Sequence, residues 1–359
     1  MSWDETTLGT CRLVCATAEA VLPTLPDASV QLILVDPPYM NTKLSYAGER
    51  LTWDRQWPTR EAYLAWLLGL AKEWRRILAP NGSLYCFASP QLAAWVEVTL
   101  SDVFQVLNRI QWLKDEGWHK KTDPSTLRAY CSPREEILFC EQVSSETVAM
   151  GEAGYTQRAR QLHTSVFAPL GQYIQQERER AGVTRDQVDV GLGYIRTKNP
   201  CRGTELCRRW EEGSSLPTQE TYDRLRTFLN TPHGQADYLR REYEDLRRPF
   251  TLSPTVPYTD VWTYATVPTG PDKHPCEKPL SLLRHMILAS SRPGDLVLDC
   301  FMGSGSTLDA AKQCGRQAIG VEQDPRWYRQ ACARVTQEHL WQAPPPQQRP
   351  TSPAQEQLL

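Results

Sequence analysis

Short apolar runs alternate with amphipathic stretches over residues 10–140 of the chain. The apolar runs predict strands at 11–15, 29–36, 83–87, 104–113 and 136–140. Between them, apolar side chains recur about every 3.6 residues, which predicts helices with one buried face at 18–25, 63–74 and 91–100. A turn is expected at 79–82, where Pro and Gly follow the second helix. This alternation is typical of an α/β fold with a doubly wound, mostly parallel sheet.

The pattern changes between about residues 145 and 250. Strand signals vanish there, and residues 151–250 hold 16 Arg and Lys against 14 Asp and Glu, whereas the whole chain has 40 against 42. We expect an inserted all-α domain at this point. Beyond it the alternation resumes, with strands predicted at 261–265, 296–299 and 318–322 and helices at 280–290, 307–313 and 327–341.

These changes predict four parts. They are an α/β half over 1–145, a helical insertion over 146–257, a second α/β half over 258–341, and a Pro- and Gln-rich disordered tail over 342–359.

Composition narrows the class of protein. The chain is 40% hydrophobic and 23% charged, and its formal net charge of -2 neither demands nor excludes nucleic acid. The 11 cysteines form no CxxC pair and no zinc-type spacing, which indicates reduced thiols and no metal site. With no signal peptide and no apolar run near the roughly 20 residues of a membrane span, we expect a soluble cytoplasmic protein.

The strand at 29–36 ends in a carboxylate, two prolines and an aromatic ring: Asp36, Pro37, Pro38 and Tyr39. Prolines cannot donate to a sheet ladder, so the strand must stop at Asp36. In parallel α/β sheets this carboxyl end is where ligands bind. An acceptor carboxylate, a fixed carbonyl and a flat ring together predict a clamp for a nucleobase. The competing interpretation is a strand that simply ends in an Asp-Pro turn.

Residues 296–307 read as a strand, a glycine turn and the start of a helix. Gly303 and Gly305 let the backbone approach a ligand closely, but Leu308 stands at the third glycine position of the dinucleotide motif, so this is a different motif. Glu322 ends the next predicted strand and is placed to bind a ribose diol. A tight turn followed by an exposed strand-end Glu is the alternative.

Together these motifs resemble the S-adenosylmethionine-dependent amino-methyltransferases of DNA. The resemblance rests on residues 36–39, 299–305, 278–279 and 75–85, and covers about 10–140 and 258–338. The catalytic motif precedes the cofactor motif, which is similar to the order in the beta group of that family. The resemblance implies a Rossmann-like methyltransferase fold with circularly permuted motif order.

The resemblance also implies site residues. Those expected at S-adenosylmethionine are Lys278, Pro279, Asp299, Phe301, Gly303, Ser304, Gly305, Thr307 and Glu322, with Lys278 beside the cofactor's carboxylate end. Asp36 and the Pro37 carbonyl would accept hydrogens from the amino group of a flipped-out base, and Tyr39 would stack on it. Ala16-Thr17 departs from the Gly-Asp pair that such enzymes often carry, which puts one contact to the cofactor's adenine in doubt.

Residues 168–230 resemble the helix-turn-helix fold of the Cro/repressor type, although the connection at 191–203 is longer than the usual turn. In the beta group the inserted piece usually reads the target sequence. The residues predicted to contact bases or phosphates are Thr204, Arg208 and Arg209, with Arg196, Lys198 and Arg202 on the DNA backbone. Alternatively, these arginines form a solvated helical face.

We therefore expect a sequence-specific methyltransferase of double-stranded DNA. The resemblance implies that it acts on N6 of adenine, because in that family a motif that begins with Asp, as here with Asp36, indicates adenine. Cytosine N4 methylation is the enzymatic alternative. A helix-turn-helix regulator with a vestigial methylase domain is the non-enzymatic one. A protein or RNA amino-methyltransferase fits less well, since the insertion would have no evident task. Analogy with beta-group relatives implies a homodimer.

Overall fold

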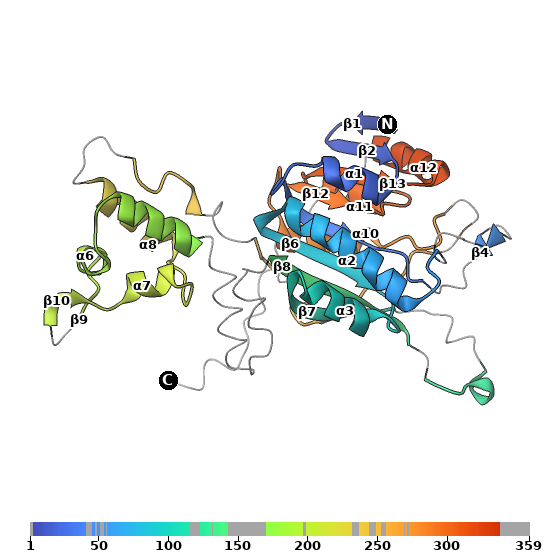
Figure 1. Ribbon diagram of the computed structural model, residues 1–359, viewed down its shortest axis with the longest axis horizontal. Helices are drawn as coiled ribbons and strands as arrows, with labels where there is room; N and C mark the ends of the chain where they lie inside the picture. Colours follow the sequence, from blue (N-terminus) through green and yellow to red (C-terminus); the bar gives the residue numbers. More distant parts are fainter. Residues whose placement is uncertain are drawn as a thin grey trace, which may run out of the picture.

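Both ends of the chain contribute strands to one 9-stranded sheet (Figure 1). The computed structural model describes residues 3–40, 45–46, 49–50, 54, 56–114, 123–130, 132–142, 170–196, 199–231, 237–243, 249–252, 256–268, 270 and 273–337. In spatial order the strands are β1 (Asp4–Leu8), β2 (Cys11–Cys15), β13 (Gln317–Glu322), β12 (Leu296–Asp299), β3 (Val30–Val35), β6 (Leu78–Ala88), β8 (Arg134–Gln142), β7 (Phe104–Leu113) and β11 (Val261–Thr263). Strands β12 and β13 therefore lie between β2 and β3.

Most of the sheet is parallel, as the alternation predicts. Strands β2, β13, β12, β3 and β6 form a continuous parallel run, and β11 joins β7 in parallel. Strand β8 is an exception to the parallel arrangement, because it pairs antiparallel with both β6 and β7. Strand β1 is also antiparallel, to β2, and the sequence analysis missed it because its residues are polar and largely exposed.

Helices cover both faces of the sheet. Strand β3 alternates between them, with Ile33 and Val35 in one core and Leu32 and Leu34 in the other. The first core packs against α1 (Ala18–Val21), α2 (Arg60–Ile77) and α3 (Ala93–Ser101). The second packs against α10 (Leu280–Ser290), α11 (Ser306–Gln313) and α12 (Pro325–Thr336). The strand that leads to Asp36 is thus buried on both sides.

The turn expected at 79–82 is wrong. Helix α2 ends at Ile77, and β6 begins directly at Leu78. The ladder to β3 pairs Val30 with Leu78 and then Leu32 with Ser83, so the Pro- and Gly-containing residues form an irregularity inside the strand. Regular pairing then runs to Val35 and Cys86, which fixes the backbone up to Asp36.

Other expected boundaries shift by a few residues. The helix predicted at 18–25 is α1 followed by a 3-10 turn at Leu22–Thr24, and the strand predicted at 261–265 is β11. The last helix, predicted at 327–341, is α12 and ends at Thr336, and the predicted tail at 342–359 lies outside the described residues. Of the helices described, none has the length and apolar character needed to cross a membrane.

The inserted segment builds a separate core. Helical residues 170–180 pack with α6 (Arg185–Gly191), α7 (Leu206–Glu211) and α8 (Gln219–Asn230), and Figure 1 shows α6, α7 and α8 apart from the sheet. The all-α expectation fails at one place, where β9 (Ile195–Arg196) and β10 (Asn199–Gly203) form an antiparallel pair between α6 and α7. This pair accounts for the long connection seen in the sequence.

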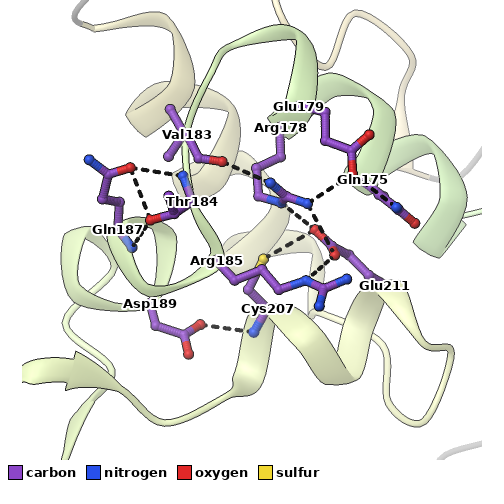
Figure 2. A network of polar contacts seen from close by, with 10 residues as sticks. All are labelled: Gln175, Arg178, Glu179, Val183, Thr184, Arg185, Gln187, Asp189, Cys207 and Glu211. Carbon is purple, nitrogen blue, oxygen red and sulfur yellow. Dashed lines mark hydrogen bonds and ion pairs between the residues drawn. The ribbon is translucent and has the colours of Figure 1, made fainter.

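A buried polar network holds the inserted helices together (Figure 2). The Glu211 carboxylate, on α7, accepts hydrogen bonds of 2.5 Å from both Arg178 and Arg185. Asp189 of α6 accepts from the backbone N–H groups of Leu206 and Cys207 at 3.0 and 2.8 Å. The start of α7 is therefore fixed by a side chain of α6.

Candidate functional site

A cavity of about 500 Å³ opens at the carboxyl ends of β2, β3, β12 and β13. Asp36 follows β3, Asp299 ends β12 and Glu322 ends β13, so three carboxylates meet at one edge of the sheet. Because β12 hydrogen-bonds directly to β3, the two predicted motifs lie side by side despite their separation in sequence. This is the edge at which parallel α/β sheets bind ligands.

The Asp36 motif forms one wall of the cavity, with Pro37 and Pro38 in its lining. The Tyr39 hydroxyl lies 2.8 Å from Asp36 Oδ1 and 3.0 Å from Glu135 Oε2, and its single hydrogen donates to one of them at a time. These contacts fix the ring beside the Asp36 carboxylate. A flat ring and a hydrogen-bond acceptor are thereby held together at the carboxyl end of β3.

Lys278 lines the cavity and is paired with two carboxylates. Its ammonium contacts Asp36 Oδ2 at 2.5 Å and Glu135 Oε2 at 3.4 Å. Lys114 completes the group, with Nζ 2.5 Å from Glu135 Oε1. Two carboxylates and two ammonium groups therefore balance in charge.

The two carboxylates of this group differ in acidity. Burial raises the pKa of Asp36, and the single neighbouring ammonium of Lys278 offsets only part of that effect. Burial acts in the same direction on Glu135, but Lys278 and Lys114 together outweigh it and lower the pKa of Glu135 to about 2. Asp36 is the better proton acceptor of the pair.

The opposite wall is the glycine turn between β12 and α11. Gly303 and Gly305 adopt φ values of +50° and +80°, which side chains rarely adopt. A Cβ on Gly303 would lie 3.2 Å from the His274 ring, and one on Gly305 would lie 2.9 Å from the Cβ of Ala331. A side chain at either position would therefore be strained by the backbone conformation and crowded by a neighbouring residue.

Glu322 anchors this turn. Its carboxylate accepts hydrogen bonds from the backbone N–H groups of Gly303 at 3.0 Å and Asp324 at 2.8 Å. Asp299 accepts similarly from the Phe301 N–H at 3.0 Å. Burial raises the pKa of both Glu322 and Asp299 to about 7. Ser304 and Thr307 also line the cavity, as does Lys278, whereas Gly305 and Pro279 lie next to lining residues.

Two tryptophans beside the predicted Phe301 form an aromatic wall that was not predicted. Trp57, Trp66 and Phe301 line the cavity, with ring centroids of neighbouring pairs 4.4 and 5.9 Å apart. The Trp66 indole donates to Glu19 at 2.5 Å. Trp66 fits the 3.6-residue period of α2, so its spacing indicates a core position and gives no sign of the cavity. Ala16 and Thr17 line the same cavity at the end of β2.

A scan against family models matches residues 30–333 to the N6_N4 family, described as DNA methylase. The matched range runs from β3 to α12 and so includes both walls of the cavity. The chain belongs to this DNA methylase family. The family depends on S-adenosylmethionine.

Known methyltransferases resemble this methylase over most of its length. The DNA adenine methyltransferase YhdJ of Escherichia coli K12 is 24% identical over 319 residues, which are 89% of this chain and 80% of that protein. The solved structure of PvuII DNA methyltransferase, named cytosine-N4-specific, is 13% identical with a TM-score of 0.51, and the match covers 95% of this chain and 92% of the PvuII chain. The structure of the M1.HpyAVI-SAM complex is 17% identical with a TM-score of 0.48, and the match covers 91% of this chain and 100% of that chain.

The cavity of the methylase fits the family's cofactor. Its volume is within the range of roughly 300–1,000 Å³ typical of small-molecule sites. The aromatic wall suits an adenine ring and a cationic sulfonium, and Glu322 offers an acceptor for hydroxyl groups. Gly303 lines the cavity, and its lack of a side chain lets the backbone approach a ligand closely.

The predicted DNA-contacting residues lie in the inserted unit of the methylase, not at the cavity. Thr204 lies just before α7, Arg208 and Arg209 lie within it, and all three are exposed. Arg208 pairs with Glu212 at 2.7 Å and Glu205 at 3.7 Å. Arg196 belongs to β9 and Arg202 to β10, whereas Lys198 lies outside the described residues.

Proposed function

We propose that this methylase transfers a methyl group from S-adenosylmethionine to N6 of a flipped-out adenine in double-stranded DNA. One observation carries the proposal. The Asp36 clamp follows β3 and the glycine turn anchored by Glu322 follows β12, and these two strands are hydrogen-bonded neighbours. Both motifs line the same cavity, so a hydrogen-bond acceptor for a base lies next to a binding site for a methyl donor.

The clamp supplies what an exocyclic amino group lacks. Its nitrogen is a poor nucleophile because the lone pair is delocalised into the ring. Hydrogen bonds from its two N–H groups to the Asp36 carboxylate and the Pro37 carbonyl favour tetrahedral geometry and stabilise the positive charge that develops on nitrogen. When bound, S-adenosylmethionine supplies an electrophilic methyl group. The raised pKa of Asp36 also suits it to accept the proton that the nitrogen must lose.

The base must leave the duplex before it can reach this cavity. Tyr39 offers a ring on which the extruded base can stack, and its tethered hydroxyl keeps that ring in place. Adenine is favoured because the motif begins with Asp36 and because YhdJ is named a DNA adenine methyltransferase. The cytosine-N4 name of the PvuII enzyme belongs to a protein that shares the fold at 13% identity.

Replacing Asp36 tests the proposal. Asp36→Ala should lower the rate of methyl transfer by roughly 10²–10³-fold, the loss typical of one preorganised charge-stabilising group. Cofactor affinity should remain, because the glycine turn and Glu322 are untouched. The measurements are incorporation of labelled methyl into DNA and calorimetric titration with S-adenosylmethionine. Asp27→Ala is the matched control, since Asp27 is exposed and precedes the opposite end of β3.

Two results would contradict the proposal. Substantial methyl transfer by a folded Asp36→Ala enzyme would overturn the role of the clamp. Mass analysis of the modified nucleosides should find N6-methyladenine, and finding N4-methylcytosine would overturn the choice of base. Specific DNA binding by the unaltered protein with no turnover at all would favour a regulator with a vestigial methylase domain.

We further propose that the inserted unit reads the DNA sequence. The support is its separate core, the exposed residues Thr204, Arg208 and Arg209 just before and within α7, and the attachment of the start of α7 to α6 through Asp189. Recognition helices of helix-turn-helix proteins present their N-terminal residues to base edges. Strands β9 and β10 would then lie next to the reading helix, with Arg196, Lys198 and Arg202 for phosphates.

A further inference from the structure

Asp36 already has partners for both of its oxygens. The Lys278 ammonium holds Oδ2 at 2.5 Å, and the Tyr39 hydroxyl lies 2.8 Å from Oδ1. In the proposed reaction the same carboxylate must accept a hydrogen from the amino group of the target base. An ammonium in contact with Asp36 draws negative charge from it and weakens it as an acceptor for a neutral donor. Methyl transfer therefore needs somewhere else for these partners to go.

Glu135 offers that place. Its Oε2 lies 3.4 Å from the same Lys278 nitrogen and 3.0 Å from the same Tyr39 hydroxyl. A small shift of the lysine side chain would exchange the nearer carboxylate for the farther one. Lys114 holds the other oxygen of Glu135 at 2.5 Å and so keeps the carboxylate in position. The low pKa of Glu135 is consistent with a group that stays ionised throughout.

We infer that Glu135 is a positioning residue for methyl transfer: it takes over Lys278 and Tyr39 when the target amino group binds Asp36. The inference rests on the proposed function. In the free enzyme Asp36 and Glu135 share the two donors. When the base is bound, Glu135 holds both, and Asp36 faces the amino group alone. The exchange moves no net charge into or out of the cavity, because both carboxylates and both lysines remain.

The neighbouring residue Glu136 provides a matched control. Successive residues of a strand point to opposite faces of the sheet. Glu136 is also buried and on β8, but it pairs with Arg134 at 2.9 Å and Arg109 at 3.6 Å, away from Lys278. A change of Glu to Gln at either position removes one charge from the same strand. Only the change at 135 removes the alternative partner of Lys278.

The test measures single-turnover methylation by the full-length enzyme. With Glu135→Gln, Lys278 should remain on Asp36 and the rate should fall roughly 10–100-fold, the range seen when an orienting partner is lost. Affinity for S-adenosylmethionine should change little, and Glu136→Gln should keep the normal rate. A second variant that also carries Lys278→Met removes the ammonium from Asp36. This double variant should be faster than Glu135→Gln alone, which is non-additive behaviour.

Several outcomes would overturn the inference. A normal rate in Glu135→Gln, or a loss that only follows the fraction of unfolded protein in thermal denaturation, would show that the cluster is structural. The rate of Lys278→Met alone is measured as well. If Lys278→Met slows Glu135→Gln by the same factor by which it slows the unaltered enzyme, Lys278 does not block Asp36. These failures differ from failure of the proposed function, in which folded Asp36→Ala would itself remain active.

Discussion

Asp36 and Glu322 line the cavity, and Glu135 contacts Lys278 beside them. These three carboxylates have different acidities because they have different cationic neighbours. Glu135 touches two ammonium groups, and its pKa falls to about 2. Asp36 touches one, and burial still raises its pKa. Among the described residues Glu322 accepts from backbone N–H groups and has no ion pair, and burial raises its pKa to about 7. The same residue type therefore serves as a fixed charge, a proton acceptor or a pH-sensitive hydroxyl acceptor, according to its surroundings.

Cofactor affinity should depend on pH through Glu322. An ionised carboxylate is a stronger acceptor for hydroxyl groups than a protonated one. Because the pKa of Glu322 is raised to about 7, affinity for S-adenosylhomocysteine should fall as pH is lowered from 8 to 6. Calorimetric titration across this range measures the effect. Glu322→Gln should bind more weakly at pH 8 and show a flatter profile, with a remaining slope from Asp299.

The same shift affects stability with the opposite sign. The folded-state pKa of Glu322 exceeds its ordinary value of 4.5, so ionisation penalises the folded state. The contribution of this group to the free energy of unfolding should thus decline as pH rises from 4.5 towards 7.

The prediction for cofactor binding can fail. If Glu322→Gln leaves the pH profile of cofactor binding unchanged, another group is responsible for that pH dependence.

At the scale of elements, the start of α7 is unusual because its own N-cap residue does not cap it. Glu205 has a φ of +67°, and no side-chain cap bond comes from it. Asp189 instead accepts from the first N–H groups of α7 while belonging to α6. The angle between the two helices is therefore tied to one buried carboxylate, in addition to the Glu211 network of Figure 2.

Removing that carboxylate should loosen the reading helix. Asp189→Ala should lower the free energy of unfolding by about 1–2 kcal/mol, the usual cost of losing a helix cap. DNA affinity should fall as well, because the exposed residues of α7 lose their fixed orientation. Chemical denaturation and fluorescence anisotropy with target DNA are the measurements. Asp186→Ala, an exposed position on the same helix, serves as the control, and equal losses in both variants would contradict the capping role.

At the scale of the whole molecule, chemistry and predicted recognition occupy units with separate cores. The two cores of the sheet hold the cavity, and a third core holds the inserted helices. No residue of the inserted unit lines the cavity among those described. A change on the inserted surface should therefore alter DNA binding without altering the cofactor site.

The two neighbouring arginines of α7 test this separation. Arg208 is already paired with Glu212 and Glu205, whereas no ion pair of Arg209 is found in the described part of the chain. Arg209→Ala should weaken DNA binding and lower the salt dependence by about one unit of slope, as expected for one lost phosphate contact. Arg208→Ala should have the smaller effect. Titrations over a range of salt measure both, and a changed cofactor affinity would argue against independent units.

Much of the sheet could be predicted from the sequence because buried parallel strands leave continuous apolar runs. Strand β12 and helix α10 match the predicted bounds. Strand β13 ends at Glu322, and β3 ends one residue before Asp36, as the pattern indicated. The strand that escaped, β1, is an exposed edge strand without such a run. Antiparallel β8 reads like its neighbours, since an apolar run does not encode strand direction.

The site was only partly predictable for a different reason. Asp36 and Glu322 stand at strand ends, where position alone suggests a ligand. Glu135 looks like one of several charges before a strand, and its importance comes from Lys278, which the fold brings to it from far along the chain. Contacts of this kind depend on tertiary structure and leave no local pattern.

The placing of β12 and β13 between β2 and β3 has a consequence for synthesis on the ribosome. The N-terminal strands emerge first, but the edge of β3 has no partner on the β12 side until residues 296–299 have been made. At typical elongation rates of roughly 5–20 residues per second, that interval is on the order of tens of seconds. During it the nascent chain exposes an apolar strand edge of the kind that chaperones cover. The enzyme can complete its central sheet only after β12 and β13 have been made.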